Sequence, residues 1–167
     1  MVLGTSKRLA LRAFGLLPRS ARRFVVRSVT PAYTAGTVAM VERDDGRWLF
    51  VRPAYRRSWA LPGGLLDRNE APEPAIHREL REELGLVVVL EPRPWVLIDP
   101  TLRRLDVVWR ARPAPGVDPD AVVVSTHELL AAGWYDPDEP PELEDEAVDL
   151  MALRRRHLEH GETVFVI

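Results

Sequence analysis

The spacing of hydrophobic and polar positions divides the chain into helical N-terminal segments and a strand-rich remainder. Apolar residues recur at helical spacing over about residues 6 to 17, and Pro18 ends this segment because the residue before a proline avoids the helical region. Residues 20 to 28 predict a second short helix. After Thr30-Pro31, a run of small, aromatic and β-branched residues over 33 to 42 predicts the first strand.

The region after this strand alternates turn signals with short extended segments. Asp44-Asp45-Gly46 predicts a hairpin turn that returns the chain through a second strand over 48 to 51. Residues 53 to 58 then form a basic loop, and residues 59 to 61 form a short extended piece. Gly63-Gly64 is expected to form a turn ahead of the next helix.

A third helix is predicted over residues 72 to 84. Pro72 and Pro74 fit only its first turn, where a missing N–H costs nothing, and Gly85 supplies a left-handed cap. The elements that follow are strands at 87–90, 95–98, 105–111 and 128–135, loops at 113–116 and 138–141, and a final helix over 144–157. This order predicts an α/β fold with a mixed sheet between helices.

Composition limits the classes of protein that the chain can represent. Its 167 residues, 46% of them hydrophobic, are enough for one domain with a core. A net charge of −2 argues against a general nucleic-acid binder, so we expect no nucleic-acid partner. Without cysteine, disulfides and thiolate catalysis are excluded. No apolar run is long enough for a transmembrane segment and no secretory signal is evident, so we expect a cytoplasmic protein.

Charge is unevenly distributed along the chain. The first 41 residues hold seven basic residues and no acid, whereas residues 136 to 149 hold eight acids and no base. One interpretation is a pair of solvated surfaces that face each other. The other makes residues 1–31 a basic helical extension that reaches a membrane surface or a partner subunit, for example in a homodimer. Residues 32–167 would then form the main domain.

Three glutamates in the third helix carry the clearest chemical signal. Glu79, Glu82 and Glu83 are related by steps of three and four residues, which places their carboxylates on one helix face. Such close negative charges repel one another unless a cation shares them. Oxygen ligands of this kind suit magnesium or manganese, which also bind phosphate oxygens. The alternative is an ordinary solvated helix, in which Arg78 and Glu82 form a weak surface ion pair.

The residues around these glutamates resemble the Nudix box, G-x5-E-x7-R-E-U-x-E-E-x-G-U, where U is apolar. Every fixed and apolar position is filled, by Gly64, Glu70, Arg78, Glu79, Leu80, Glu82, Glu83, Gly85 and Leu86. At ordinary residue frequencies, a chance match is on the order of 10⁻⁸ per starting point. The resemblance implies a Nudix-type α/β/α sandwich over about residues 32 to 158.

The resemblance also implies a metal-dependent hydrolase that uses Mg²⁺, or alternatively Mn²⁺. Water would attack phosphorus and cleave a diphosphate bond in a nucleoside diphosphate derivative or a nucleoside triphosphate. The Gly63 carbonyl, Glu82 and Glu83 would be metal ligands, and Glu79 a further ligand or the base. A non-catalytic nucleotide-binding regulator would show eroded carboxylates, and here none is eroded. Isopentenyl-diphosphate isomerases share the fold, but the absence of cysteine argues against that activity.

Further candidates surround the box. Arg78 would orient a carboxylate, either Glu70 or Glu79. Glu128 is an additional ligand or base, or else an exposed residue at a strand end. For substrate binding, one candidate is Gly64, whose backbone can approach phosphate closely. The others are Arg52, Arg56 and Arg57, which lie just before Gly63-Gly64 and could equally be solvated.

A nucleobase would need an aromatic partner. Tyr55 or Trp59 could stack on it, and a core role is the alternative for Trp59. The four histidines show no ligand spacing and are expected at the surface.

Overall fold

The computed structural model describes residues 10, 12–145, 147–148, 150–152 and 161–167. The chain forms two compact units, Met1–Tyr33 and Thr34–Ile167. In the first unit, residues 10 and 12–16 are helical, and the rest of the helix predicted over 6–17 lies outside the described residues except for Leu17. Helix α2, Arg19–Val29, confirms the second prediction and ends at Thr30, whose backbone is extended before Pro31.

The second unit is built on a mixed sheet of six strands. They are β1 (Thr34–Val41), β3 (Gly63–Leu65), β4 (Val88–Leu90), β5 (Trp95–Asp99), β6 (Arg104–Pro113) and β8 (Val164–Val166). The order is β3-β1-β6-β5-β8, and β4 also pairs with β6. β1 is parallel to β6 and β5 is parallel to β8, whereas the other pairs are antiparallel. The predicted mixed sheet is confirmed.

The predicted hairpin between the first two strands is wrong. The turn itself is present, with Gly46 at a φ of 84° and its N–H bonded to the Arg43 carbonyl at 2.9 Å. However, β1 and β2 (Trp48–Pro53) share only the isolated bridge between Glu42 and Trp48. β6 pairs with β1 along its whole length on one edge, and β3 pairs with residues 36–38 on the other edge. β2 instead pairs with β7 (Leu129–Tyr135) in a separate two-stranded sheet.

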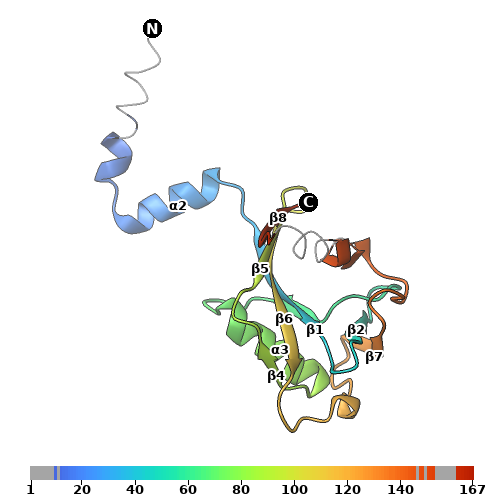
Figure 1. Ribbon diagram of the computed structural model, residues 1–167. Coiled ribbons are helices and arrows are strands. Elements are labelled where there is room, and N and C mark those ends of the chain that lie inside the picture. The colour runs from blue at the N-terminus through green and yellow to red at the C-terminus, as the bar shows by residue number, and fades with distance from the viewer. Residues whose placement is uncertain (1–9, 11, 146, 149, 153–160) are drawn as a thin grey trace. The chain divides into compact units, whose positions relative to one another are not determined.

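Alternating residues of the strands build a core on each face of the larger sheet. Ala39 and Val41 of β1 join a cluster with Ile76 and Leu80 of α3 (Pro72–Leu84). Met40 lies on the other face, in a cluster that contains Leu150 of the last helical segment. Figure 1 shows α3 and this segment on opposite sides of the strands. The α/β/α sandwich expected from the sequence is therefore confirmed.

Local signals account for the ends of α3. Pro72 occupies the first turn, and Gly85 adopts the left-handed conformation at φ 63° with its N–H bonded to the Arg81 and Leu80 carbonyls. The predicted bounds of this helix are confirmed. The last helical segment comprises residues 145, 147–148 and 150–152, and positions 146, 149 and 153–157 of its prediction lie outside the described residues.

Three short elements were not predicted. They are β3, the 3₁₀ turn at Pro119–Ala121, and the edge strand β8, which lies against β5 in parallel register. Within the described part of the chain, no helix is both long enough and apolar enough to cross a membrane.

Candidate functional site

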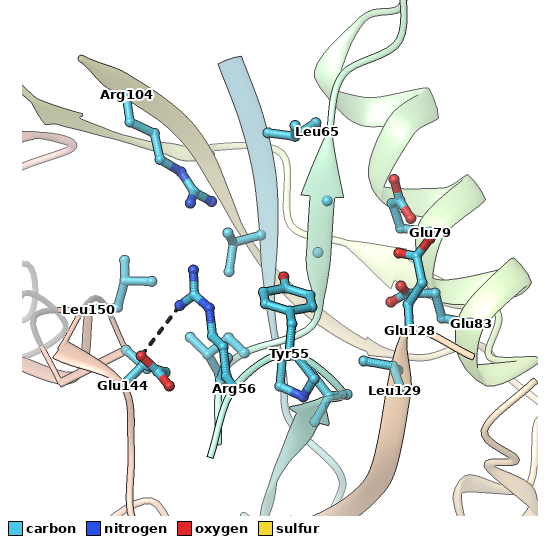
Figure 2. A pocket seen from close by; sticks show the side chains of 18 of the residues that line it. Tyr55, Arg56, Leu65, Glu79, Glu83, Arg104, Glu128, Leu129, Glu144 and Leu150 are labelled. Atoms are coloured by element: carbon cyan, nitrogen blue, oxygen red, sulfur yellow. Dashed lines mark ion pairs between the residues drawn. The ribbon is translucent and has the colours of Figure 1, made fainter. Parts of the chain in front are cut away.

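A cavity of about 490 Å³ lies along β3 in the second unit (Figure 2). One wall comes from α3 and the start of β7, and another comes from β6 and the last helical segment. The polar residues that line it are Arg78, Glu79 and Glu83 of α3, Glu128 before β7, Tyr55 and Arg56 after β2, Asp67, Arg104 and Glu144.

Gly63 and Gly64 form part of the cavity wall within β3. The turn expected here is wrong, because these residues pair in antiparallel register with Val38 and Thr37 of β1. A Cβ atom on Gly63 would overlap the Thr37 carbonyl oxygen, and one on Gly64 would overlap the Glu79 carboxylate. The two glycines therefore allow backbone to lie directly against β1 and against a candidate catalytic carboxylate.

Arg78 joins the loop before α3 to the helix. Its Nε and Nη2 donate to both oxygens of Glu70 at 3.0 and 2.8 Å, and its Nη1 donates to Glu79 Oε1 at 2.9 Å. The Asp67 N–H also donates to Glu70 at 3.0 Å. Hydrogen bonding to Arg78, followed by this backbone N–H, lowers the pKa of Glu70 to about 2. Arg78 thus binds both Glu70 and Glu79, which the sequence analysis had considered as alternative partners of this arginine.

Three carboxylates lie together at one end of the cavity. Glu79 and Glu83 are one turn apart on α3, and Figure 2 shows Glu128 beside them at the start of β7. Burial raises the pKa of Glu79. Burial, followed by the charges of Glu79 and Glu128, raises the pKa of Glu83 to about 7. The protein therefore buries Glu83 beside two other acidic side chains, which make its ionisation less favourable.

These residues have the donor chemistry that a hard cation needs. The carboxylates of Glu79, Glu83 and Glu128 and the Gly63 carbonyl all offer oxygen ligands. Among the described residues, no three acidic, histidine or cysteine side chains are close enough together to form a complete protein site. Mg²⁺ commonly keeps several waters and binds through one or two carboxylates plus substrate phosphates, so the donors present fit this ion.

Glu82 lies apart from the other candidate ligands. Its side chain is 61% exposed and 3.6 Å from Arg78 Nη1, and it does not line the cavity. The surface ion pair considered from the sequence is thus present. Such a pair stabilises a helix by only about 0.3 kcal/mol. Glu82 remains on the rim of the acidic end, where only a shift of its side chain would bring it to a shared cation.

The three candidate arginines, Arg52, Arg56 and Arg57, lie in different environments. Arg56 lines the cavity, and its guanidinium is 3.5 Å from the Glu144 carboxylate. Arg52 lies instead 6.0 Å from the centre of the Trp59 ring, and Arg57 is exposed without lining the cavity. Of these candidates, the structure brings only Arg56 to the same cavity as the carboxylates.

The two aromatic candidates, Trp59 and Tyr55, also lie in different environments. Trp59 packs against Tyr135 with ring centres 5.1 Å apart and joins the core cluster that contains Leu150, which agrees with its core role. Tyr55 is 76% exposed and lines the cavity, with the Arg56 guanidinium 5.6 Å from its ring centre. Tyr55 is therefore the aromatic side chain available to a ligand. Of the histidines, His127 is exposed and His77 half-buried, whereas His157 and His160 lie outside the described residues.

Sequence reasoning missed Arg104, Asp106 and Glu144. Arg104 lines the cavity from β6, and its Nε donates to the buried Asp106 at 2.6 Å. The signal was an acid inside a predicted strand, because Asp106 interrupts the apolar pattern of residues 105–111. Glu144 was assigned only to the start of the final helix. Neither its pairing with Arg56 nor the position of Arg104 could be read from local spacing.

The raised pKa of Glu83 predicts that the stability of the protein depends on pH when a chelator keeps it free of metal. An ordinary glutamate has a pKa of 4.5, so in the folded, metal-free protein Glu83 stays protonated up to about pH 7. The free energy of unfolding should therefore fall between these two pH values, by on the order of 3 kcal/mol from this group. Urea denaturation in EDTA should show Glu83→Gln gaining stability relative to wild type from pH 5 to pH 8. An unchanged difference would contradict the assigned shift.

The cavity lies in the part of the chain that comparisons with known proteins assign to a family. Residues 32–155 match the family model for the NUDIX domain. The chain therefore belongs to the Nudix family and is a Nudix-type pyrophosphohydrolase, as its box predicted.

The similar proteins and solved structures match different fractions of the chain. A MutT-like protein of Streptomyces ambofaciens is 34% identical over 112 residues, which are 67% of this chain and 70% of that protein. An RNA pyrophosphohydrolase of Halorhodospira halophila is 49% identical over only 47 residues, 28% of this chain and 26% of its own. A NUDIX hydrolase structure from Nitrosomonas europaea has a TM-score of 0.67 at 21% identity, covering 83% of this chain and 80% of that one. The last likeness concerns the fold alone.

Proposed function

We propose that this protein hydrolyses a diphosphate bond in a nucleoside diphosphate derivative or a nucleoside triphosphate, with Mg²⁺ as its cofactor and Mn²⁺ as a substitute. The observation that carries the proposal is the position of Glu83. It is a buried carboxylate, 7% exposed, that faces the charges of Glu79 and Glu128 in an open cavity. A structural role alone gives no reason to bury this charge among like charges, whereas a shared cation does.

The side chains have distinct roles in this proposal. Glu83, Glu79 and the Gly63 carbonyl hold the cation, and Glu82 supplies a further carboxylate from the rim. When bound, Mg²⁺ neutralises charge on the diphosphate and lowers the pKa of a bound water. Glu128 lies beside the α3 carboxylates at the start of β7, where it can accept the proton of the water that attacks phosphorus.

Arg78 serves this site without touching the substrate. Its two bonds to Glu70 and its single bond to Glu79 leave the Glu79 carboxylate one orientation, against Gly64. A ligand whose direction is fixed before the cation binds loses less entropy on binding. The Arg78–Glu70 pair is therefore a support for the ligand set.

The other side of the cavity suits the rest of the substrate. Tyr55 offers an exposed ring on which a nucleobase can stack, and Arg56 lies beside that ring. Two structures of similar fold are those of a UDP-X diphosphatase (TM-score 0.63) and an ADP-ribose pyrophosphatase of Streptococcus suis (TM-score 0.58). The compounds in these two names, UDP-X and ADP-ribose, are nucleoside diphosphate derivatives. They guide the choice of compounds to test.

A phosphate-release screen tests the proposed function. Nucleoside triphosphates and nucleoside diphosphate derivatives are incubated with the protein, and products are measured by coupled phosphate release and by chromatography. We expect turnover with Mg²⁺ or Mn²⁺ and none with EDTA. Binding of nucleotides without turnover in either metal would instead indicate the non-catalytic regulator.

A further inference from the structure

The cavity has two chemically different ends. Figure 2 shows the carboxylates of Glu79, Glu83 and Glu128 along one side, and Arg56 and Arg104 along the other, with Tyr55 between them. At the carboxylate end, a cation bound by the glutamates would hold the diphosphate of the substrate. The remainder of the same substrate must then extend toward the arginines, because the cavity continues in that direction.

Arg104 is held in this position by a buried acid. Arg104 and Asp106 are two residues apart on β6 and so lie on the same face of the sheet. Arg104 Nε donates to Asp106 Oδ2 at 2.6 Å, and the side chains are 26% and 8% exposed. The pair lies on the face where Val108 and Met40 form the second core cluster. A strand, rather than a loop, therefore sets the location of this guanidinium.

The arrangement around Asp106 has a cost in stability. Its second oxygen, Oδ1, is buried and has no hydrogen-bond partner within the described residues. This oxygen lies against Gly36, where any Cβ atom would overlap it. Burying an unpartnered carboxylate oxygen is unfavourable, and such groups in native proteins call for an explanation. The explanation offered by the cavity is the fixed orientation of Arg104.

We propose that Arg104 is a specificity-determining residue that selects substrates with a carboxylate or phosphate group on the moiety beyond the scissile diphosphate, and that Asp106 is its positioning residue. The planar guanidinium matches both groups and forms stronger hydrogen bonds with them than with neutral hydroxyls. Arg56 lies on the same side of the cavity and pairs with Glu144 at 3.5 Å. This inference rests on the proposed function.

Matched substrate pairs test the inference. UDP-glucuronate and UDP-glucose differ by a carboxylate, and NADPH and NADH differ by a phosphate, so the pairs distinguish the two sources of negative charge. With Mg²⁺, wild type should have a kcat/KM roughly tenfold or more higher for the charged member of at least one pair. Arg104→Ala should lose that advantage, so its kcat/KM should fall roughly tenfold or more further for the charged member than for the neutral member. Arg104→Lys should keep part of it.

Asp106 and a control arginine complete the design. Asp106→Asn should lower the preference for the charged substrate mainly through KM, which a merely structural role would not do selectively. Arg110→Ala is the matched control, because Arg110 lies on the same strand, pairs with Glu91 at 3.2 Å and does not line the cavity. It should leave the preference unchanged.

Two results would overturn the inference: a wild-type protein without preference in either pair, or a preference that survives Arg104→Ala. If no compound is hydrolysed, the proposed function fails separately. Titration calorimetry of the same pairs with Mg²⁺ then decides the role of Arg104, because Arg104→Ala should weaken binding of the charged member alone.

Discussion

Replacing Glu83 by glutamine should lower kcat by at least roughly 100-fold while leaving the fold intact. Glutamine keeps the size of the side chain, so the α3 packing around this 7% exposed position is preserved. It removes the charge that Glu79 and Glu128 face, and with it one of the proposed ligands of the cation. Steady-state kinetics against Mg²⁺ concentration should show both a lower maximal rate and a higher concentration for half-activation.

Two further variants on the same helix sharpen this test. Glu73→Gln is the control, because Glu73 is an exposed residue of the first turn of α3 and does not line the cavity. It should leave kcat within about twofold of wild type. Glu82→Gln should weaken Mg²⁺ activation if the rim carboxylate reaches the cation. A Glu83→Gln protein with near-normal kcat on a confirmed substrate would remove Glu83 from the site.

A single methyl group at Gly64 should also abolish most activity. The added Cβ would lie 2.5 Å from the Glu79 Cδ, so the carboxyl group must move away. Moving it breaks the 2.9 Å bond from Arg78 and misdirects a proposed ligand. We expect Gly64→Ala to reduce kcat roughly 10- to 100-fold, the usual effect of losing a group that orients a metal ligand.

The melting temperature separates this effect from unfolding. The clash of Gly64→Ala is with the end of a side chain, so thermal denaturation should shift by only a few degrees. Gly15→Ala is the control glycine, because nothing lies within 4 Å of a Cβ built there. Unchanged kcat in Gly64→Ala would show that the orientation of Glu79 does not matter for turnover.

Local sequence signals predicted α3 better than they predicted strand partners. Pro72 and Gly85 fix the ends of the helix through backbone conformation, which depends on a few neighbouring residues. The partner of β2 depends instead on which edges are open after the whole sheet has assembled. β1 pairs with β3 and β6, and β2 pairs with β7, some 80 residues away along the chain. The turn at Gly46 could not reveal this.

The candidate site divides in the same way. Periodicity correctly placed Glu79 and Glu83 on the same side of the helix, since residues four apart lie above one another. It could not show that Glu82 sits on the solvent side of them, or that Glu128 faces them from another element. Arg104 and Glu144 reach the cavity from strands and segments far apart in sequence. Only the assembled fold brings those side chains into one cavity.

The central claim is that water attacks phosphorus in a diphosphate bond. Hydrolysis of a confirmed nucleoside diphosphate substrate in ¹⁸O-labelled water, with Mg²⁺ present, tests it most directly. Mass spectrometry of the products should find one ¹⁸O atom in a single phosphate product and none in the sugar or nucleoside. Label on a carbon-bound oxygen, or products that form equally well in EDTA, would contradict the mechanism built on Glu79, Glu83 and Glu128.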